Sequence, residues 1–82
     1  MNIAEIKQNV QAYISENTFA SKDKITESTL VFKEGFLDSM GLVMLITFLE
    51  EKFGIETTDA DMVEENFESI NAISEFVSKK LA

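Results

Sequence analysis

Residues 38–55, DSMGLVMLITFLEEKFGI, predict a helix with a clear start and a clear end, and the other elements can be arranged around it. Asp38 is a favourable N-cap, so the helix is expected to begin at Ser39 and to continue to Phe53. Gly54 followed by Ile55 is typical of a left-handed C-terminal cap with its apolar contact. The stripe expected to face a core consists of Leu42, Ile46, Leu49 and Phe53, with Leu45 beside it.

The outer face of the same helix is apolar as well. A helix in a small bundle should have a polar outer face, yet this one stays mostly apolar until Glu50 and Glu51. An exposed apolar patch with an acidic rim is typical of a partner site, and methionine suits a surface that meets several partners. Deeper burial of the whole helix explains the pattern equally well. The apolar and neutral residues off the core stripe are Met40, Val43, Met44 and Thr47.

Ser39 lies at the expected first helical position. Free backbone N–H groups and the positive end of the helix dipole favour a phosphate there, although the charge of Asp38 partly opposes it. Gly41 follows two residues later, where a glycine costs roughly 0.5–1 kcal/mol relative to alanine. It would let another group approach the helix start closely, it serves a close helix contact, or it is simply tolerated there. A functional Ser39 is therefore one hypothesis, because serine is common at helix starts.

The N-terminal third predicts one helix followed by a long connection. An amphipathic helix is expected from about Asn2 to Asn17, capped by Asn2 with Glu5 reaching back. Its apolar positions are Ile3, Ile6, Val10, Tyr13 and Ile14. Residues 18–37 have no sustained period, and a loop of this length is unusual unless it is functional or pinned. Pinning, with one short helical turn, is predicted from Phe19, Ile25, Leu30, Val31, Phe32 and Phe36.

Two more helices are expected after residue 55. Thr58 followed three residues later by Asp61 indicates a short third helix through Glu65. Ser69 can cap a last helix, whose inner stripe is Ile70, Ile73, Phe76, Val77 and Leu81. The sequence therefore predicts an all-α fold, a bundle of three main helices and one short helix, as a single domain over residues 1–82.

The amino-acid composition excludes several classes of function. The 82 residues include no Cys and no His, which excludes disulfides, thiolate metal sites, Cys nucleophiles and His bases. Fifteen acidic residues against seven lysines give a net charge of −8. This argues against nucleic-acid binding; it favours steering toward basic protein partners, or solubility alone. The N-terminus lacks a secretory pattern, and the longest apolar run is too short for a membrane span, so a cytoplasmic protein without membrane insertion is expected.

Residues 35–41, GFLDSMG, resemble the modification site of acyl carrier proteins. The pattern of that family is an Asp-Ser pair, then Leu or Met, at the start of the second helix of a four-helix bundle. The resemblance extends through residues 42–46 and 49–55 and into residues 69–73, so it covers nearly the whole chain. It implies an acyl-carrier-like bundle.

The resemblance implies that Ser39 receives 4′-phosphopantetheine from coenzyme A, transferred by a phosphopantetheinyl transferase that Asp38 helps to bind and act. The arm would supply the thiol that this chain does not encode. The protein would then be a monomeric, non-catalytic carrier. A ligase would load acyl or aminoacyl cargo as a thioester, and downstream synthases or transferases would use it. The residues expected to meet partner enzymes are Asp38, Met40, Val43, Met44, Thr47, Glu50 and Glu51.

Two positions depart from the pattern of fatty-acid synthesis carriers, which usually have acids where this chain has Gly41 and Met44. The sequences DSMG and FGI look more like D-alanyl carriers and stand-alone carriers of nonribosomal peptide or polyketide pathways, so a specialised biosynthetic role is expected. Seven phenylalanines indicate a well-filled core and argue against sequestration of a long acyl chain.

Other classes of function stay open from the residues alone. A non-catalytic helical adaptor would bind partners through the apolar, acid-rimmed helix without a covalent arm. A calcium-binding module is suggested by Asp59, Asp61, Glu64 and Glu65, but the EF-hand spacing is missing. Paired carboxylates can perform acid–base chemistry, but nothing in so small a chain points to an enzyme pocket.

Overall fold

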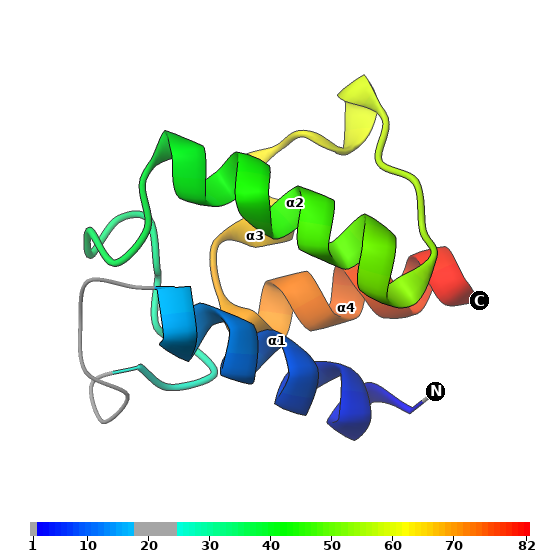
Figure 1. Ribbon diagram of the computed structural model, residues 1–82, viewed down its shortest axis with the longest axis horizontal. Coiled ribbons are helices and arrows are strands. Elements are labelled where there is room, and N and C mark those ends of the chain that lie inside the picture. Colours follow the sequence, from blue (N-terminus) through cyan, green and yellow to red (C-terminus); the bar gives the residue numbers. More distant parts are fainter. Residues whose placement is uncertain (1, 18–24) are drawn as a thin grey trace.

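The computed structural model describes residues 2–17 and 25–82 as a small helical bundle (Figure 1). Its elements are α1 (Ile3–Asn17), α2 (Ser39–Phe53), the 3₁₀ turn η2 (Asp59–Asp61), α3 (Glu64–Phe67) and α4 (Ile70–Leu81). The described residues form no strand, so the predicted all-α class, with three main helices and one short helix, is confirmed. No helix in these ranges combines the length and the apolar character needed to cross a bilayer.

Helices α1 and α4 lie side by side, and α2 lies across the same core (Figure 1). At the start of α1, Asn2 Oδ1 accepts a hydrogen bond from Glu5 N at 2.9 Å. The Glu5 carboxylate accepts in return from the Asn2 side-chain amide at 3.4 Å, so the predicted cap forms. The buried face of α1 consists of Ile6, Val10 and Ile14. Ile3 was expected on that face but is 40% exposed, at the first position of α1.

The bounds and caps predicted for α2 are confirmed. Asp38 is extended and caps the helix, and Gly54 adopts a left-handed conformation with φ of 68° while donating its N–H to the Glu50 carbonyl. The buried stripe differs from the expected one, since Leu45, Leu49 and Phe53 are buried. Leu42 and Ile46 are only half-buried. Both border surface grooves beside Met62, so α2 is turned with Leu45 toward the centre of the core.

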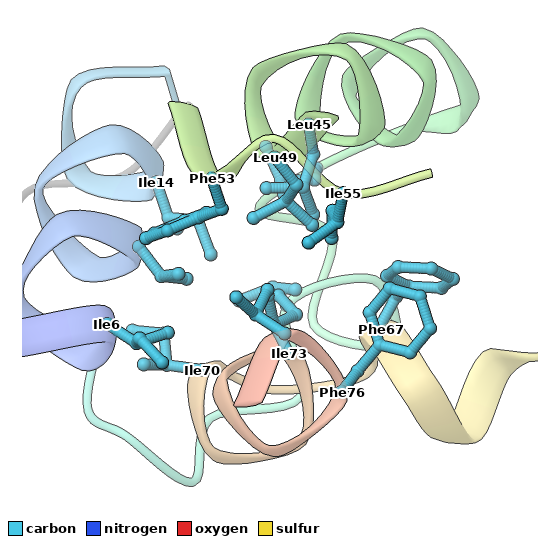
Figure 2. Close-up of a cluster of buried hydrophobic side chains, with 14 of the residues drawn as sticks. Ile6, Ile14, Leu45, Leu49, Phe53, Ile55, Phe67, Ile70, Ile73 and Phe76 are labelled. Carbon is cyan, nitrogen blue, oxygen red and sulfur yellow. The ribbon is translucent and has the colours of Figure 1, made fainter. Parts of the chain in front are cut away.

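The core is built from the inner faces of the three long helices (Figure 2). In this view Ile14 of α1 lies beside Phe53 of α2, and Ile6 of α1 lies beside Ile70 of α4. Leu45 and Leu49 of α2 lie across the core from Ile73 of α4. Aromatic pairs border this centre. Tyr13 stacks on Phe48 with ring centroids 4.3 Å apart, and Phe67 packs edge-on against Phe76 at 5.1 Å. Burial raises the pKa of Tyr13 above the ordinary value of a phenol.

The described part of the long connection, residues 25–37, is pinned as predicted. Val31 is fully buried; its N–H donates to the Glu68 carbonyl at 3.0 Å, and its carbonyl accepts from Phe36 N and Leu37 N. Glu27 also holds the segment, accepting from Asn71 N through its carbonyl and pairing with Lys7 at 3.1 Å. The expected short helical turn forms as a single turn, in which Glu34 N donates a hydrogen bond to the Leu30 carbonyl at 2.9 Å. Phe19 lies outside the described residues.

The predicted third helix is wrong in its bounds. The expected Thr58–Asp61 box forms, but it caps only the turn η2. The Val63 N–H then donates to the Asp61 carbonyl at 2.8 Å, and Val63 is extended. This tight turn interrupts the helix, so α3 begins only at Glu64. The interruption places Met62 and Val63 on the wall of a pocket described below.

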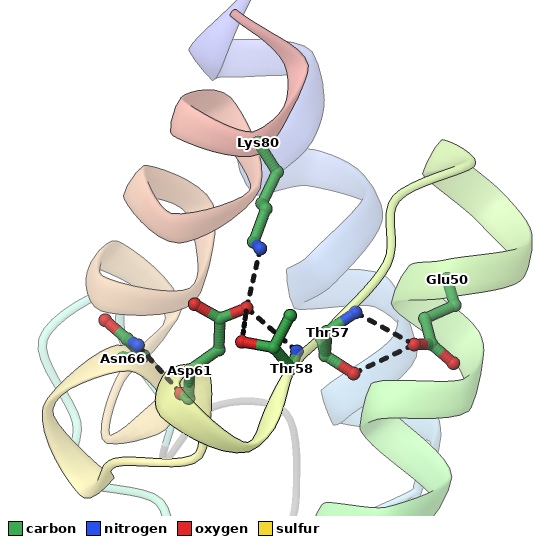
Figure 3. A network of polar contacts seen from close by, with 6 residues as sticks. All are labelled: Glu50, Thr57, Thr58, Asp61, Asn66 and Lys80. Carbon is green, nitrogen blue, oxygen red and sulfur yellow. Dashed lines mark hydrogen bonds and ion pairs between the residues drawn. The ribbon is translucent and has the colours of Figure 1, made fainter.

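A polar network holds the α2–α3 connection against both neighbouring helices (Figure 3). The Glu50 carboxylate accepts from the N–H of Thr57 at 3.0 Å and from its hydroxyl at 2.8 Å. Asp61 Oδ2 accepts from Thr58 N at 2.9 Å and pairs with Lys80 Nζ at 2.6 Å. The Asp61 carbonyl accepts from the Asn66 side chain at 2.8 Å. These bonds fix the connection to α2 at one end and to α4 at the other.

Helix α4 begins at the predicted cap, where Ser69 Oγ accepts from Ala72 N at 3.1 Å. Its buried face contains Ile70, Ile73, Phe76 and Val77 as expected, and also Ser74. Leu81 was expected on this face but is 42% exposed, because the helix extends past the core at its last turn. The Ser74 hydroxyl is fully buried and has no hydrogen-bond partner among residues 2–17 and 25–82.

Replacing Ser74 by alanine should stabilise the fold. Removing an unpaired buried hydroxyl is expected to raise the free energy of unfolding by about 1 kcal/mol, or the melting temperature by roughly 4–8 °C for a domain of this size. Ser69→Ala is the matched control, because loss of that cap should lower stability by about 1 kcal/mol. Thermal denaturation followed by circular dichroism measures both. Destabilisation by Ser74→Ala would show that its hydroxyl is paired in solution.

Stability should fall in acid as the network protonates. The two Thr57 hydrogen bonds, led by the one from its backbone N–H, lower the pKa of Glu50 below 4.5. The Lys80 ammonium, followed by the Thr58 N–H, lowers the pKa of Asp61 below 3.8. A carboxyl group whose pKa is lowered by folding stabilises the fold above its unfolded pKa, and this contribution is lost as the pH falls through the folded pKa.

We therefore expect Glu50→Gln and Asp61→Asn each to reduce the drop in melting temperature between about pH 6 and about pH 3. Glu51→Gln, one residue along α2, is the matched control for removal of a charge. Melting curves across this range provide the measurement. An acid-induced drop as large in both variants as in the parent chain would contradict a stabilising role for these bonds.

Candidate functional site

Ser39 is the first residue of α2, and its side chain is exposed. Within residues 2–17 and 25–82 its hydroxyl makes no hydrogen bond. The turn of residues 31–37 lies before it, held by the bonds of Phe36 and Leu37 to the Val31 carbonyl. The structure therefore presents a solvent-reachable hydroxyl at a helix start, as the sequence predicts.

The cap of α2 leaves free donors beside this hydroxyl. Asp38 Oδ1 accepts from Gly41 N at 2.8 Å, and the Asp38 carbonyl accepts from Leu42 N at 3.0 Å. The N–H groups of Ser39 and Met40 have no acceptor in the described part of the chain. Exposed N–H groups at the positive end of a helix favour an anionic oxygen. The residues around the hydroxyl therefore fit a phosphodiester on Ser39.

Gly41 has a role that differs from the close external approach considered from the sequence. A Cβ at this position would lie 3.2 Å from Leu37 Cδ2, 3.3 Å from Leu37 Cβ and 3.5 Å from Asp38 Oδ1. Leu37 is buried, so it has little room to move. Gly41 thus makes room for the segment that caps the helix, which is the internal-contact alternative. It fixes the position of the hydroxyl indirectly, through Leu37 and Asp38.

The apolar outer face of α2 is exposed, which excludes deeper burial of the helix as its explanation. Met40 is 66% exposed, Val43 55% and Met44 53%. Thr47 is also exposed and donates its hydroxyl to the Val43 carbonyl at 3.1 Å. We refer to Met40, Val43, Met44 and Thr47 as the outer face of α2. It begins one residue after Ser39, so a protein that reaches the hydroxyl would meet it.

The three acidic residues expected at partner contacts differ in how exposed they are and in their hydrogen bonds. Asp38 and Glu51 are exposed at the two ends of the outer face. Glu50 is half-buried, and Thr57 occupies its Oε2 atom. Holding the α2–α3 connection is therefore a structural role of Glu50 that sequence reasoning missed. The signal for it, a Thr seven residues after a Glu across a helix end, is too common to be read from one sequence.

A pocket of about 250 Å³ opens between α2, α3 and the 25–37 segment. The residues around it are Phe32, Leu42, Met62, Val63, Glu64 and Phe67. Leu42 lies one turn after Ser39 on α2. Sequence reasoning did not find this pocket, because its wall comes from three separate segments and depends on the break between η2 and α3.

The structure gives no support to a calcium site. Among the residues it describes, no three acidic side chains are grouped to hold a metal ion. Asp61, which the calcium hypothesis requires, is instead bonded to Lys80 and Thr58.

Comparison with known proteins agrees with this geometry. The family model described as "Phosphopantetheine attachment site" matches residues 8–77. The acyl carrier protein of Thermotoga maritima is 31% identical over 94% of this chain and 93% of its own length. That of Lactobacillus acidophilus is 33% identical over 95% and 91%, and that of Thermosynechococcus vestitus 28% identical over 100% and 99%.

Two solved structures share the fold. The acyl carrier protein of Enterococcus faecalis superposes with a TM-score of 0.77 at 25% identity, over 98% of this chain and 99% of that one. The second comes from the crystal structure of an engineered Bradyrhizobium japonicum glycine:[carrier protein] ligase complexed with carrier protein from Agrobacterium tumefaciens and ATP. Its matched chain gives a TM-score of 0.74 at 24% identity, over 95% of this chain and 99% of that one.

The family match spans most of the chain, and the exposed hydroxyl stands where a phosphodiester fits. Three curated relatives with the same name cover nearly the full length. The chain belongs to the acyl carrier proteins, a non-catalytic family that carries its cargo on a covalently attached 4′-phosphopantetheine arm.

Proposed function

We propose that Ser39 carries the phosphopantetheine arm and that the protein presents aminoacyl or short acyl cargo in a specialised biosynthetic pathway. The proposal depends on one observation, the exposed Ser39 hydroxyl at the start of α2. Two backbone N–H groups beside it have no acceptor in the described part of the chain. We further propose that the carrier acts as a monomer in the cytoplasm.

Arm attachment needs only a nucleophile from this chain. Ser39 Oγ forms the new bond to phosphorus, and the P–O bond to the leaving nucleotide of coenzyme A breaks. We assign the base that takes the serine proton to the transferase, since this chain has no histidine and Asp38 Oδ1 already accepts from Gly41 N. The N–H groups of Ser39 and Met40 then face the attached phosphodiester. The arm supplies the thiol that holds the cargo.

Partner enzymes would dock along the outer face of α2. Its apolar side chains can be buried by a partner, and exposed Asp38 and Glu51 at its ends can meet basic residues. The net charge of −8 would speed encounters with positively charged enzymes. The proposed partners are a phosphopantetheinyl transferase, a loading ligase, and downstream synthases or transferases.

Three observations favour small or aminoacyl cargo. Gly41 and Met44 stand where fatty-acid carriers usually have acids. A solved structure with the same fold contains a glycine-activating ligase and a carrier protein. The pocket beside Leu42, about 250 Å³, lies below the roughly 300–1,000 Å³ typical of sites for drug-sized ligands. A pocket of this size suits a short chain or a cargo that stays outside.

The attachment residue can be tested by intact mass. Incubation with coenzyme A and a broad-specificity phosphopantetheinyl transferase should add one phosphopantetheine to the parent chain. Ser39→Ala should gain none, because its Oγ nucleophile is gone. Ser28→Ala, an exposed serine in the 25–37 segment, is the control and should be modified like the parent. Modification of Ser39→Ala, or of no variant at all, would contradict the assignment.

The same arm-bearing protein tests the cargo. It would be offered ATP with amino-acid-activating ligases in parallel with a fatty-acid-activating ligase, and the thioester would be detected by mass. Aminoacyl or short acyl loading is expected. Loading only with long acyl chains would contradict the cargo proposal while leaving Ser39 as the attachment residue.

Asp38 combines a cap with a charge, and two variants separate these roles. Asp38→Asn keeps an oxygen that can accept from Gly41 N, so its melting temperature should stay close to that of the parent. Asp38→Ala loses this bond and about 1 kcal/mol of stability. If the transferase recognises the charge, both variants should be modified more slowly. A normal rate for Asp38→Asn would restrict Asp38 to capping.

A further inference from the structure

We propose that Met40 and Met44 form an oxidation-sensitive site on the outer face of α2, where conversion to the sulfoxides weakens docking of the enzyme that modifies Ser39. The inference rests on the proposed attachment at Ser39 and adds a modification site to it. The oxidant belongs to the hydroperoxides, of which hydrogen peroxide is the simplest.

The two thioethers are open to solvent and lie on one face. Met40 is 66% and Met44 53% exposed, and side chains four residues apart in a helix are neighbours. The chain contains no cysteine, so no thiol of its own competes for the oxidant before the arm is attached. Exposure of the sulfur governs how readily it is oxidised. Both methionines are therefore expected to react in the folded state.

The chemistry is a two-electron oxygen transfer. The methionine sulfur forms an S–O bond, and the O–O bond of the hydroperoxide breaks to leave an alcohol, or water when the oxidant is hydrogen peroxide. The sulfur is oxidised and the peroxide is reduced. Sulfoxide reductases reverse the change, because two enzyme thiols become a disulfide and the oxygen leaves as water.

The position of the pair determines the consequence. Docking at Ser39 must bury Met40, the next residue along the chain. A sulfoxide oxygen buried against an apolar surface without a hydrogen bond carries a desolvation cost. Neither methionine belongs to the buried core, so oxidation should leave the bundle folded. The modification would therefore affect encounters at the outer face and spare stability.

The remaining described methionine provides an internal comparison. Met62 is also exposed but lies between η2 and α3 and not on α2; it borders the pocket beside Val63 and the groove beside Val43 and Thr47. Met62→Leu removes this sulfur while leaving Met40 and Met44 intact. Leucine is similar in size to methionine and cannot be oxidised in this way, so the sensitivity of Met40→Leu/Met44→Leu is measured as the ratio of its own transfer rates before and after peroxide.

The experiment uses the unmodified 82-residue protein treated with hydrogen peroxide. Peptide mapping by mass spectrometry identifies the oxidised residues, and transfer from coenzyme A by a broad-specificity transferase measures docking. We expect sulfoxides at Met40 and Met44, an unchanged melting temperature, and a transfer efficiency lowered about tenfold, which corresponds to roughly 1.4 kcal/mol. Methionine sulfoxide reductases A and B should restore the rate together, since each reduces one epimer.

The variants distinguish a specific effect of oxidation at Met40 and Met44 from general oxidative damage to the protein. Met40→Leu/Met44→Leu should keep its transfer rate after peroxide, whereas Met62→Leu should lose it like the parent chain. Equal rates of phosphopantetheine transfer to oxidised and untreated parent protein would overturn the proposed effect of oxidation. They would leave the proposed attachment at Ser39 intact. An equal loss in Met40→Leu/Met44→Leu would overturn the effect of oxidation as well. An untreated parent chain that accepts no arm would overturn the proposed function, and the docking role of the methionines with it.

Discussion

The hydrogen bond from Gly41 N to Asp38 Oδ1, 2.8 Å long, is the constraint on which the functional end of the molecule depends. It fixes α2 to begin at Ser39, which places the hydroxyl at the first helical position, where it is exposed. A Cβ at Gly41 would lie 3.2 Å from Leu37 Cδ2, so the glycine leaves room for the buried residue that precedes the cap.

Features that depend on neighbours in the chain could be predicted from the sequence. The caps at Asn2, Asp38 and Ser69 form as expected, because each involves a side chain and an N–H group three residues later. The left-handed Gly54 follows from the same local logic. Ser39 could be placed because its position depends on one such cap. Its identity as a candidate site, however, came from the family resemblance, since a capped serine alone is common.

Features that depend on distant segments could not be predicted. Periodicity placed Leu42 and Ile46 in the α2 core stripe, but the rotation of α2 is set by its packing partners, and both are half-buried. The Thr58–Asp61 box predicted a helix, yet the Val63–Asp61 turn interrupts it. The pocket needs that interruption together with residues from α2 and the 25–37 segment. Ser74 resembles an ordinary outer-face serine until α4 is placed in the bundle.

Exposed charges and apolar side chains occupy different parts of α2, because the Glu50 carboxylate is bonded to Thr57. The exposed acids of α2 and its cap that border the outer face are therefore Asp38 and Glu51 at its ends. Met40, Val43 and Met44 lie between them. Charges at the ends can steer an encounter over a distance of about 10 Å, the range left by salt screening. The side chains between them act only on contact. With partners docked as proposed, encounter rate and residence time would depend on different residues, which would suit a carrier that meets several enzymes and leaves each one.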